Sequence, residues 1–548
     1  GGRDRLEALR QAVGTIPTVD VVRRAAAGLL GLPDDDVAAT DRFTDLGGDS
    51  LSAVTFGAML RDLVDVEVPV TAVVSPTADL ADVAAAIDRG RATAQSGDTD
   101  STLTFESVHG ADPDEVVADD LTPDRVLGPD FQAAARRADG PREDVRTVLV
   151  TGATGYLGRF LLLDWLERMD AVDGRVVTLV RARSAEDARR RLDATFGVTG
   201  EHAVDPELRD RWTDLANRRL DIEVGDVARP RLGLSDERWT RLAQDVDHIV
   251  HPAAMVNHAL PYREMFSPNV GGTAEVIRLA ATHHLKPVDY LSTVAVAAGV
   301  EALTEDGDIR IESPRRSLGG DYANGYATSK WAGEVLLRNT FDAVGLPVTV
   351  FRSNMILAHP RWRGQVNVPD VFTRTLASVT ACSLAPRTFY SASAGERPRA
   401  HYDGLPVDFT AAAIAELGHR DRRGYRTYHV VNPHHDGISW DTVIDWLEDA
   451  GVSVERIDDH DEWYRRFHDA LTALPEPMRS HSVLPLIHAY REPTPPLDGS
   501  PIPAERFRAA VRESLAPRWS DIPHLGPDLV AKYVRDLDAL DIVSLQLS

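Results

Sequence analysis

One glycine-rich turn restricts the possible folds of this chain more than any other feature. Residues 145–150 are a mainly apolar run of strand length, residues 159–166 continue with the pattern of a helix, and three glycines lie between them. In such a turn the first glycine permits a tight bend, the second lets a pyrophosphate approach the main chain, and the third lets the helix pack on the strand. The N–H groups and dipole at the helix start also favour an anion. The turn therefore predicts a dinucleotide site in an α/β fold. The residues expected to contact the cofactor here are Gly152, Thr154, Gly155, Tyr156, Leu157 and Gly158.

Length and composition set the broad class of the protein. At 548 residues, with 43% hydrophobic and 26% charged residues, the chain has the composition of a globular protein of two or three domains. No apolar run approaches the ~18 residues that span a bilayer, and the start of the chain lacks a secretory pattern. The single cysteine, Cys382, cannot form an intrachain disulfide. We therefore expect a cytoplasmic protein with no membrane partner. The net charge of −25 also disfavours nucleic acid, whose binding relies on clustered Lys and Arg.

Residues 1–90 predict a small domain of four short helices. Apolar residues recur with helical spacing at 21–30, 51–62 and 80–87, and a shorter helical piece is expected at 69–74. Ser50 follows a Gly-Gly turn at the start of the second helix, where the helix N-terminus favours a phosphate. A plain N-cap is the commoner role for such a serine, so the residue pattern alone leaves both roles open.

A longer motif around Ser50 suggests its role. Residues 43–53, with the sequence FTDLGGDSLSA, resemble the attachment motif of peptidyl carrier proteins. The resemblance implies that Ser50 bears 4′-phosphopantetheine, added by a phosphopantetheinyl transferase, and that the domain carries an acyl thioester on this arm. Residues 91–144 show little periodicity and include a small, polar run, which favours a flexible linker. The alternative is an ordered strap on the next domain for the part after Leu103.

Basic residues after the next predicted strand indicate the cofactor. Folds of this type that prefer NAD place an acidic residue about 20 positions past the glycines, whereas arginine there accommodates a 2′-phosphate. Arg181 and Arg183 follow the strand at 176–180, and Arg191 in the following helix is within reach of the same phosphate. These arginines favour NADPH. The alternative is that they are ordinary solvated charges.

Two later segments carry the residues expected to perform the chemistry. Tyr326 and Lys330 are four residues apart, on one face of a predicted helix, and the strand at 288–293 ends in Ser292 and Thr293. Tyrosine has a reference pKa of ~10, and a neighbouring cation such as Lys330 favours its ionised form. Thr293 can donate to a reacting carbonyl, and we place Ser292 on the substrate side. A Tyr-x-x-x-Lys pair alone is common in helices. The prediction of a catalytic pair therefore depends on its position after the glycine turn and after the strand that ends in hydroxyl residues.

These features together resemble a known family. Residues 145–548 resemble the thioester reductase domains, which are extended short-chain dehydrogenases with the same Gly-x-x-Gly-x-x-Gly spacing; further matching runs lie at 251–254, 324–334 and 401–407. With the carrier, the chain is similar to the carboxylic acid reductases. The resemblance implies a Rossmann-type α/β domain with an NADPH-binding core at about 145–360 and a helical substrate subdomain mainly at 361–548. It also implies reduction of a carrier-bound acyl thioester to an aldehyde. The adenylation domain of that family is missing from this sequence, which we therefore expect to be a C-terminal fragment.

The resemblance adds further site residues and one departure. It implies that Lys330 holds the cofactor ribose and that Ser353 borders the nicotinamide. At Asn354 the family pattern leads us to expect aspartate; our hypothesis is that the amide relaxes the stop at aldehyde, and the alternative is neutral variation in a loop. The other cofactor contacts expected at strand ends are Asp226, Val227, Pro252, Ala253 and Ala254.

Several residues and readings compete with this interpretation. We interpret His251 as structural and Asn269 as either a helix cap or a buried bridge behind the site.

The adjacent histidine pairs at 283–284 and 434–435 lack metal-site spacing, so we expect no metal. The alternative functions are a terminal reductase of a peptide synthetase that releases aldehyde or alcohol, and a noncatalytic nucleotide-sensing module that docks a carrier.

Overall fold

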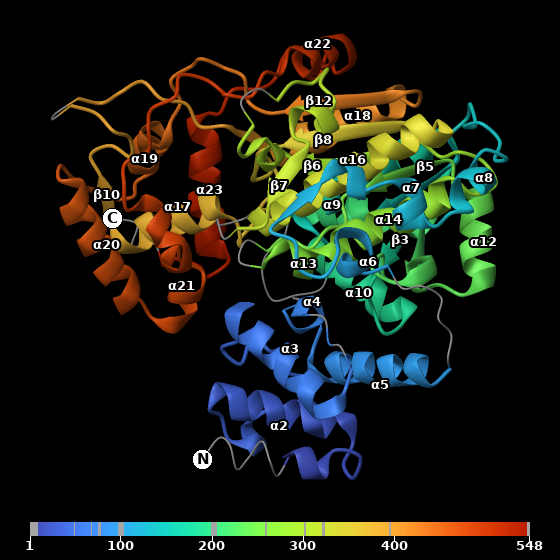
Figure 1. The fold of residues 1–548 in the computed structure, drawn as a ribbon. Coiled ribbons are helices and arrows are strands. Elements are labelled where there is room, and N and C mark those ends of the chain that lie inside the picture. Colours follow the sequence, from blue (N-terminus) through green and yellow to red (C-terminus); the bar gives the residue numbers. More distant parts are fainter. Residues whose placement is uncertain are drawn as a thin grey trace.

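The computed structural model describes residues 9–48, 50–66, 68, 70–74, 78–96, 103–198, 205–257, 260–300, 303–319, 324–393 and 396–544. Figure 1 shows a small helical domain, in blue, below a larger α/β domain, and a mainly helical lobe of orange and red elements at the left. No helix in the described ranges is long and apolar enough to cross a membrane.

A seven-stranded parallel sheet forms the centre of the large domain, in the order β12-β8-β6-β5-β2-β3-β4. The chain enters at β2, adds β3 and β4 on one side, and returns to the other side of β2 with β5. This order confirms the predicted Rossmann-type fold, in which ligands bind where the strand order reverses. The strands are β2 (Thr147–Thr151), β3 (Arg175–Val180), β4 (Leu220–Val224), β5 (His248–His251), β6 (Val288–Thr293), β8 (Val348–Ser353) and β12 (Tyr425–Val430).

Helices cover both faces of the sheet, as parallel strands with buried faces require. Strand β2 is buried at every position, including the threonines at its two ends, which explains why its central residues are all apolar. One face packs against α9 (Tyr156–Ala171), α10 (Ala185–Thr195), α11 (Pro206–Arg219), α18 (Val407–Arg420) and α22 (Glu505–Ser514). The other face packs against α12 (Asp236–Asp245), α14 (Gly272–Ala280) and α16 (Asn324–Val344). Between β5 and α14 lie α13 (Tyr262–Met265) and a π-helical turn at Phe266–Gly271.

The segment after Leu103 is an ordered strap, which corrects the prediction of a flexible linker for this part of 91–144. Its apolar side chains, including Phe105, Val116 and Leu121, are buried in the same core as α14 and α16. These residues have no regular spacing, so their burial was not visible as periodicity. Residues 97–102 lie outside the described residues. The strap contains α6 (Phe105–His109), β1 (Glu115–Val117), α7 (Pro123–Leu127) and α8 (Phe131–Ala135), and β1 pairs antiparallel with β7 (Arg315–Ser317).

The substrate lobe is discontinuous in sequence. Its core surrounds Phe372, Trp463 and Tyr533, whereas β12, α18 and α22 return to the layers of the main sheet. The region after residue 360 therefore contributes both to the substrate lobe and to the layers of the main sheet. The lobe contains α17 (Val371–Cys382), α19 (Trp440–Asp449), α20 (His460–Ala473), α21 (Glu476–Ser480), α23 (Pro527–Ala539) and the paired strands β10 (Leu384–Pro386) and β13 (Glu455–Ile457). The remaining short elements are α15 (Ile309–Glu312), β9 (Met355–Leu357) and β11 (Gly404–Pro406).

The small domain contains the predicted helices at the expected places. Its core includes Val22 and Phe56, and the ring of Phe43 stacks on Phe56 at 4.8 Å. A Cβ at Gly48 would lie 2.2 Å from the Phe43 ring, so a side chain does not fit beside this stack. Helix α3 begins at Ser50, whose side chain lies outside the described part. The helices are α2 (Thr18–Leu30), α3 (Ser50–Val64), α4 (Val70–Val73) and α5 (Leu80–Ser96).

Candidate active site

The glycine turn lies where the ends of β2 and β5 meet. Gly152 has φ +63°, and a Cβ there would lie 2.7 Å from the N and Cα atoms of Ala253. A Cβ at Gly158 would lie 2.0 Å from the Gly152 carbonyl oxygen. The bend and the close helix-to-strand packing expected of the first and third glycines are therefore present, and they bring the segment Pro252, Ala253 and Ala254 beside the turn.

The start of α9 fits a pyrophosphate. Gly155 is its N-cap and supplies no side-chain acceptor, so the first main-chain N–H groups, including that of Leu157, have no intrahelical partner. Thr154 lies in the turn just before this helix. The Tyr156 hydroxyl instead donates to the carbonyl of Gln365 (3.1 Å), and burial raises its pKa well above the usual value. Any contact of Tyr156 with a cofactor would thus come from its main chain.

Tyr326, Lys330 and Thr293 gather at the carboxyl end of β6. Lys330 is 2% exposed, and its Nζ donates to the Leu291 carbonyl (2.6 Å). The Thr293 hydroxyl oxygen accepts from the N–H of Ala295 (3.1 Å), which leaves the hydroxyl hydrogen to donate elsewhere. Tyr326 is one helical turn before Lys330 on α16. The predicted catalytic residues therefore lie on neighbouring elements at one end of the sheet.

Burial shifts the pKa values of the tyrosine and the lysine in opposite directions. It raises the pKa of Tyr326 to about 12, so the phenol is protonated near neutrality. It lowers the pKa of Lys330 to about 7, although the carboxylate of Glu334 partly opposes that shift. The expectation that Lys330 would favour the ionised form of Tyr326 is therefore not met here, because desolvation of the phenol dominates. A protonated phenol is the form that can donate a proton.

A buried ionic cluster lies behind the site. Glu334 and Arg352 are 0% and 1% exposed, and the Arg352 Nη2 donates to Glu334 Oε2 at 2.7 Å. Arg352 Nη1 also lies 3.0 Å from Nε2 of His429. Ser292 donates to Glu334 as well, which corrects its predicted place on the substrate side. Successive side chains of a strand point to opposite faces, so Ser292 turns inward where Thr293 turns toward the site.

The cluster includes residues that our sequence reasoning did not identify. Glu334 lies four positions after Lys330, on the same face of α16. The feature of the sequence that could have indicated its role is a charged residue within a run of mostly apolar helix positions.

Two buried polar residues have the structural roles expected of them. His251 Nδ1 lies 2.8 Å from the Thr151 hydroxyl and its Nε2 lies 3.3 Å from that of Thr273. Burial lowers its pKa to about 3, so the ring is neutral. Asn269 bridges segments: its Oδ1 accepts from the Met255 N–H (2.7 Å) and its Nδ2 donates to the Ser329 hydroxyl (2.8 Å). Of the two predicted roles, helix cap and buried bridge, Asn269 therefore has the second.

The predicted 2′-phosphate arginines follow β3, and the side chains of two of them, Arg183 and Arg191, have protein partners here. Arg183 pairs with Asp79 and Asp82 of the small domain. Arg191 donates to the Arg181 carbonyl at 2.7 Å. Both lie near the end of β3, as expected from the sequence.

The remaining predicted residues lie at strand ends. Asp226 accepts from the Ala228 N–H (2.9 Å), which stabilises the turn after β4, and Val227 packs beside Gly272. The Ser353 hydroxyl donates to the Ser292 carbonyl at 3.4 Å. Asn354 is exposed, and its main-chain N–H lies 3.4 Å from the Val430 carbonyl.

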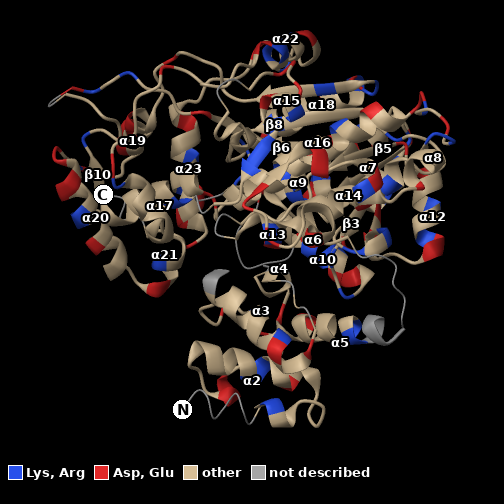
Figure 2. Cartoon of the chain, in the orientation of Figure 1, with Lys and Arg blue, Asp and Glu red and all other residues tan. Residues whose placement is uncertain are grey.

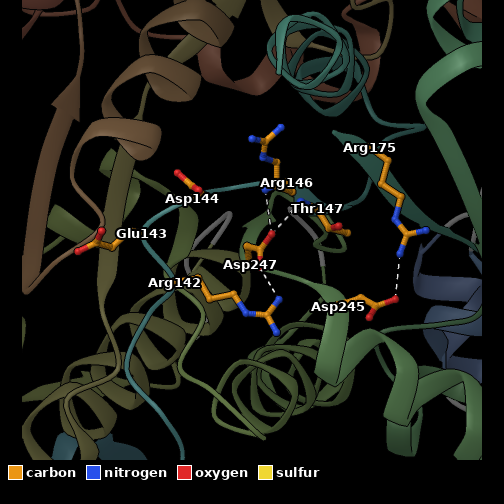
Figure 3. Close-up of a pocket in the computed structure, with 8 residues that line it drawn as sticks. All are labelled: Arg142, Glu143, Asp144, Arg146, Thr147, Arg175, Asp245 and Asp247. Atoms are coloured by element: carbon orange, nitrogen blue, oxygen red, sulfur yellow. Dashed lines mark hydrogen bonds and ion pairs between the residues drawn. The ribbon is translucent and has the colours of Figure 1, made fainter. Parts of the chain in front are cut away.

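A shallow cavity of about 570 Å³ lies elsewhere, at the amino ends of β2 and β3. Figure 3 shows that ion pairs cross it: Arg142 bonds to Asp247 at 2.8 Å and Arg175 to Asp245 at 2.9 Å. Four of its charged side chains are already paired, and the cavity lies at the opposite edge of the sheet from the glycine turn. Within the described residues, no group of three or more His, Cys, Asp or Glu side chains could hold a metal ion.

Comparison with known families matches both domains. The family described as male sterility protein, an NAD-binding family, matches residues 150–414, and the phosphopantetheine attachment site family matches residues 20–87. A carboxylic acid reductase of Mycobacterium marinum is 49% identical over 99% of this chain and 46% of its own length. The chain thus spans about half the length of the curated relatives it matches.

Solved structures match the large domain and, at lower similarity, the fold of a chain with both domains. The reductase domain of a nonribosomal peptide synthetase from Mycobacterium tuberculosis is 50% identical, with a TM-score of 0.73 over 79% of this chain and 100% of that domain. A thiolation-reductase di-domain from an archaeal nonribosomal peptide synthetase has a TM-score of 0.53 at 17% identity and covers 95% of this chain and 97% of its own. At that identity the second match shows the fold alone.

Proposed function

The chain belongs to the family of carboxylic acid reductases and nonribosomal peptide synthetase reductase domains, and we propose that it uses NADPH to reduce an acyl thioester on Ser50 to an aldehyde. The observation that carries the proposal is the position of Tyr326 and Lys330. Lys330 on α16 reaches the end of β6 through its hydrogen bond to the Leu291 carbonyl, and Tyr326 packs against an apolar cluster that joins the carrier core to Leu260 and Met265 of the large domain. The same helix therefore borders both the predicted cofactor site and the apolar cluster through which the carrier contacts the large domain.

Each residue of the site has a specific task in this reaction. NADPH supplies a hydride when it is bound. The glycine turn and the start of α9 hold the pyrophosphate, and Lys330 holds the nicotinamide ribose. The Thr293 hydroxyl donates to the thioester carbonyl and stabilises the charge that develops on its oxygen, because its own oxygen is already fixed by the Ala295 N–H. Tyr326, protonated at neutral pH, gives its proton to that oxygen. Hydride addition and this proton give a hemithioacetal. Its C–S bond then breaks as the hydroxyl proton leaves the oxygen and the sulfur takes up a proton, which yields an aldehyde and a free thiol.

This function requires other proteins. A phosphopantetheinyl transferase modifies Ser50, and an adenylation domain loads the acyl group. Tethering makes the encounter of thioester and reductase intramolecular, so the reductase needs no high affinity for a free substrate. The alternative of a peptide synthetase reductase differs in what is loaded and in whether the aldehyde is reduced further to an alcohol.

Tyr326→Phe tests the catalytic proposal. We expect thioester-dependent NADPH oxidation to fall by about 10²-fold or more, the range for loss of a positioned proton donor, with NADPH affinity retained. The matched control is Tyr464→Phe in α20, remote from α16, which should keep full activity. Absorbance at the NADPH band gives turnover and fluorescence gives affinity. Equal activity of wild type and Tyr326→Phe would refute the assignment, and a wild type with no turnover on any thioester would favour the nucleotide-sensing alternative.

A further inference from the structure

Arg183 contacts the carrier domain at the position expected to bind a phosphate. It lies in the loop between β3 and α10, where this fold places the group that selects the 2′-phosphate. Its guanidinium donates to Asp79, and its Nε lies 3.6 Å from Oδ1 of Asp82. The hydrogen bond with Asp79 raises the pKa of Arg183. Carboxylates of the carrier thus bind the guanidinium that is expected to meet the 2′-phosphate.

The two carboxylates form a fixed acidic pair. Asp82 Oδ2 accepts from the Asp79 N–H (3.1 Å), and Asp79 Oδ1 accepts from the Asp82 N–H (2.9 Å). These reciprocal bonds close the start of α5 and orient both carboxylates before any partner binds. The Arg183 side chain is 56% exposed, so an anion from solvent can still reach it. Figure 2 shows residues of both signs on α5 and α10.

The docked carrier also reaches the other end of the site. The apolar core of the carrier continues into Leu260 and Met265 of the large domain, and Met255 and Tyr326 pack against it. Figure 1 shows α4 beneath α13 and α5 beneath α10. The carrier therefore contacts both the expected 2′-phosphate end and the apolar cluster on which Tyr326 packs.

We propose that the 2′-phosphate of NADPH and the Asp79–Asp82 pair compete for Arg183, so that cofactor binding weakens this docked position of the carrier. The inference rests on the proposed use of NADPH. A guanidinium group makes its paired hydrogen bonds with one anion at a time. Two carboxylates beside it also repel a phosphate placed next to them. Because linkage is reciprocal, the docked carrier lowers NADPH affinity by the same factor by which NADPH loosens the carrier. NADPH binding thereby weakens the contact between the carrier and the loop that joins β3 to α10.

The double variant Asp79→Asn/Asp82→Asn tests the competition. Asparagine keeps an oxygen that can cap the helix, so α5 keeps its start while both charges are lost. We expect NADPH and 2′,5′-ADP to bind about two- to fivefold more tightly than to wild type, the range for a partly exposed ion pair. NADH affinity should not change, and 1 M salt should remove the difference. Asp88→Asn, on the same helix but paired with Arg91 within the carrier, is the matched control and should match wild type.

The outcomes separate this inference from the function on which it rests. Equal NADPH affinity in wild type and double variant, or equal tightening for NADH, would overturn the competition and leave the reductase proposal standing. Failure of wild type to bind NADPH at all would overturn both. Small-angle scattering gives a second measurement: 2′,5′-ADP should increase the radius of gyration of the wild-type chain and 5′-AMP should not. An unchanged radius with saturating 2′,5′-ADP would also refute the release of the carrier.

Discussion

Glu334 is the residue whose replacement tests the energetics of this site most directly. Its carboxylate is fully buried and receives two hydrogen bonds from Arg352 Nε (3.1 Å each) and one from Nη2 (2.7 Å). In Glu334→Gln one oxygen becomes an NH₂ group that faces the arginine donors, and the Arg352 charge stays buried without a counterion. Breaking a buried pair in this way costs about 3–5 kcal/mol.

The matched control is Asp342→Asn on the same helix. The change from carboxylate to amide is the same, but Asp342 is 44% exposed and pairs with Arg310 at the surface. We therefore expect a loss of only about 0.2–1 kcal/mol. Adding Arg352→Met to Glu334→Gln should recover part of the loss, because it removes the orphan charge.

Urea unfolding followed by tryptophan fluorescence measures these differences in the large domain alone. Each of the nine tryptophans lies after residue 144, so the carrier contributes no signal. A loss below about 1 kcal/mol for Glu334→Gln, or one equal to that of Asp342→Asn, would show that the buried cluster does not have the strength inferred from its geometry.

Three further predictions concern the lysine, the glycine turn and the departing asparagine. Burial lowers the pKa of Lys330 from 10.5 to about 7, so between these values the unfolded chain binds more protons and stability rises with pH. The unfolding free energy of wild type minus that of Lys330→Met should therefore increase by about 2 kcal/mol from pH 7 to pH 9 in urea titrations, and a flat difference would refute the shift. Gly158→Ala places a Cβ 2.0 Å from the Gly152 carbonyl oxygen and should cost about 1–3 kcal/mol and weaken NADPH binding in fluorescence titrations. Gly140→Ala, where nothing lies within 4 Å, is its control and should change neither quantity. Asn354→Asp should lower the ratio of alcohol to aldehyde measured by chromatography, and an unchanged ratio would remove the hypothesis for this residue.

Features set by local sequence were predictable. The bend at Gly152 and the packing at Gly158 follow from a strand-turn-helix pattern, and the parallel order of the sheet follows from the alternation of strands and helices. The position of Tyr326 and Lys330 on one helix was predictable because their spacing is one helical turn.

Features that depend on a distant surface were not predictable in the same way. The strap after Leu103 has irregularly spaced apolar residues, and only the faces of α14 and α16 explain why they are buried. Ser292 and Thr293 look equivalent in the sequence, but strand alternation turns the first toward Glu334. The acidic partners of Arg183 belong to another domain, about a hundred positions earlier in the chain. Glu334 lies four residues from Lys330, but many charged residues have this spacing by chance, so the spacing alone does not predict a buried ion pair.

The outermost strand of the main sheet affects how this protein can be dissected into fragments. β12 and the helix that covers it, α22, come after residue 414, where the match to the NAD-binding family ends. A recombinant piece cut there would leave β8 with an unpaired main-chain edge, and such edges pair with other molecules. A stable truncated enzyme must therefore extend at least through Ser514, and shorter pieces should precipitate.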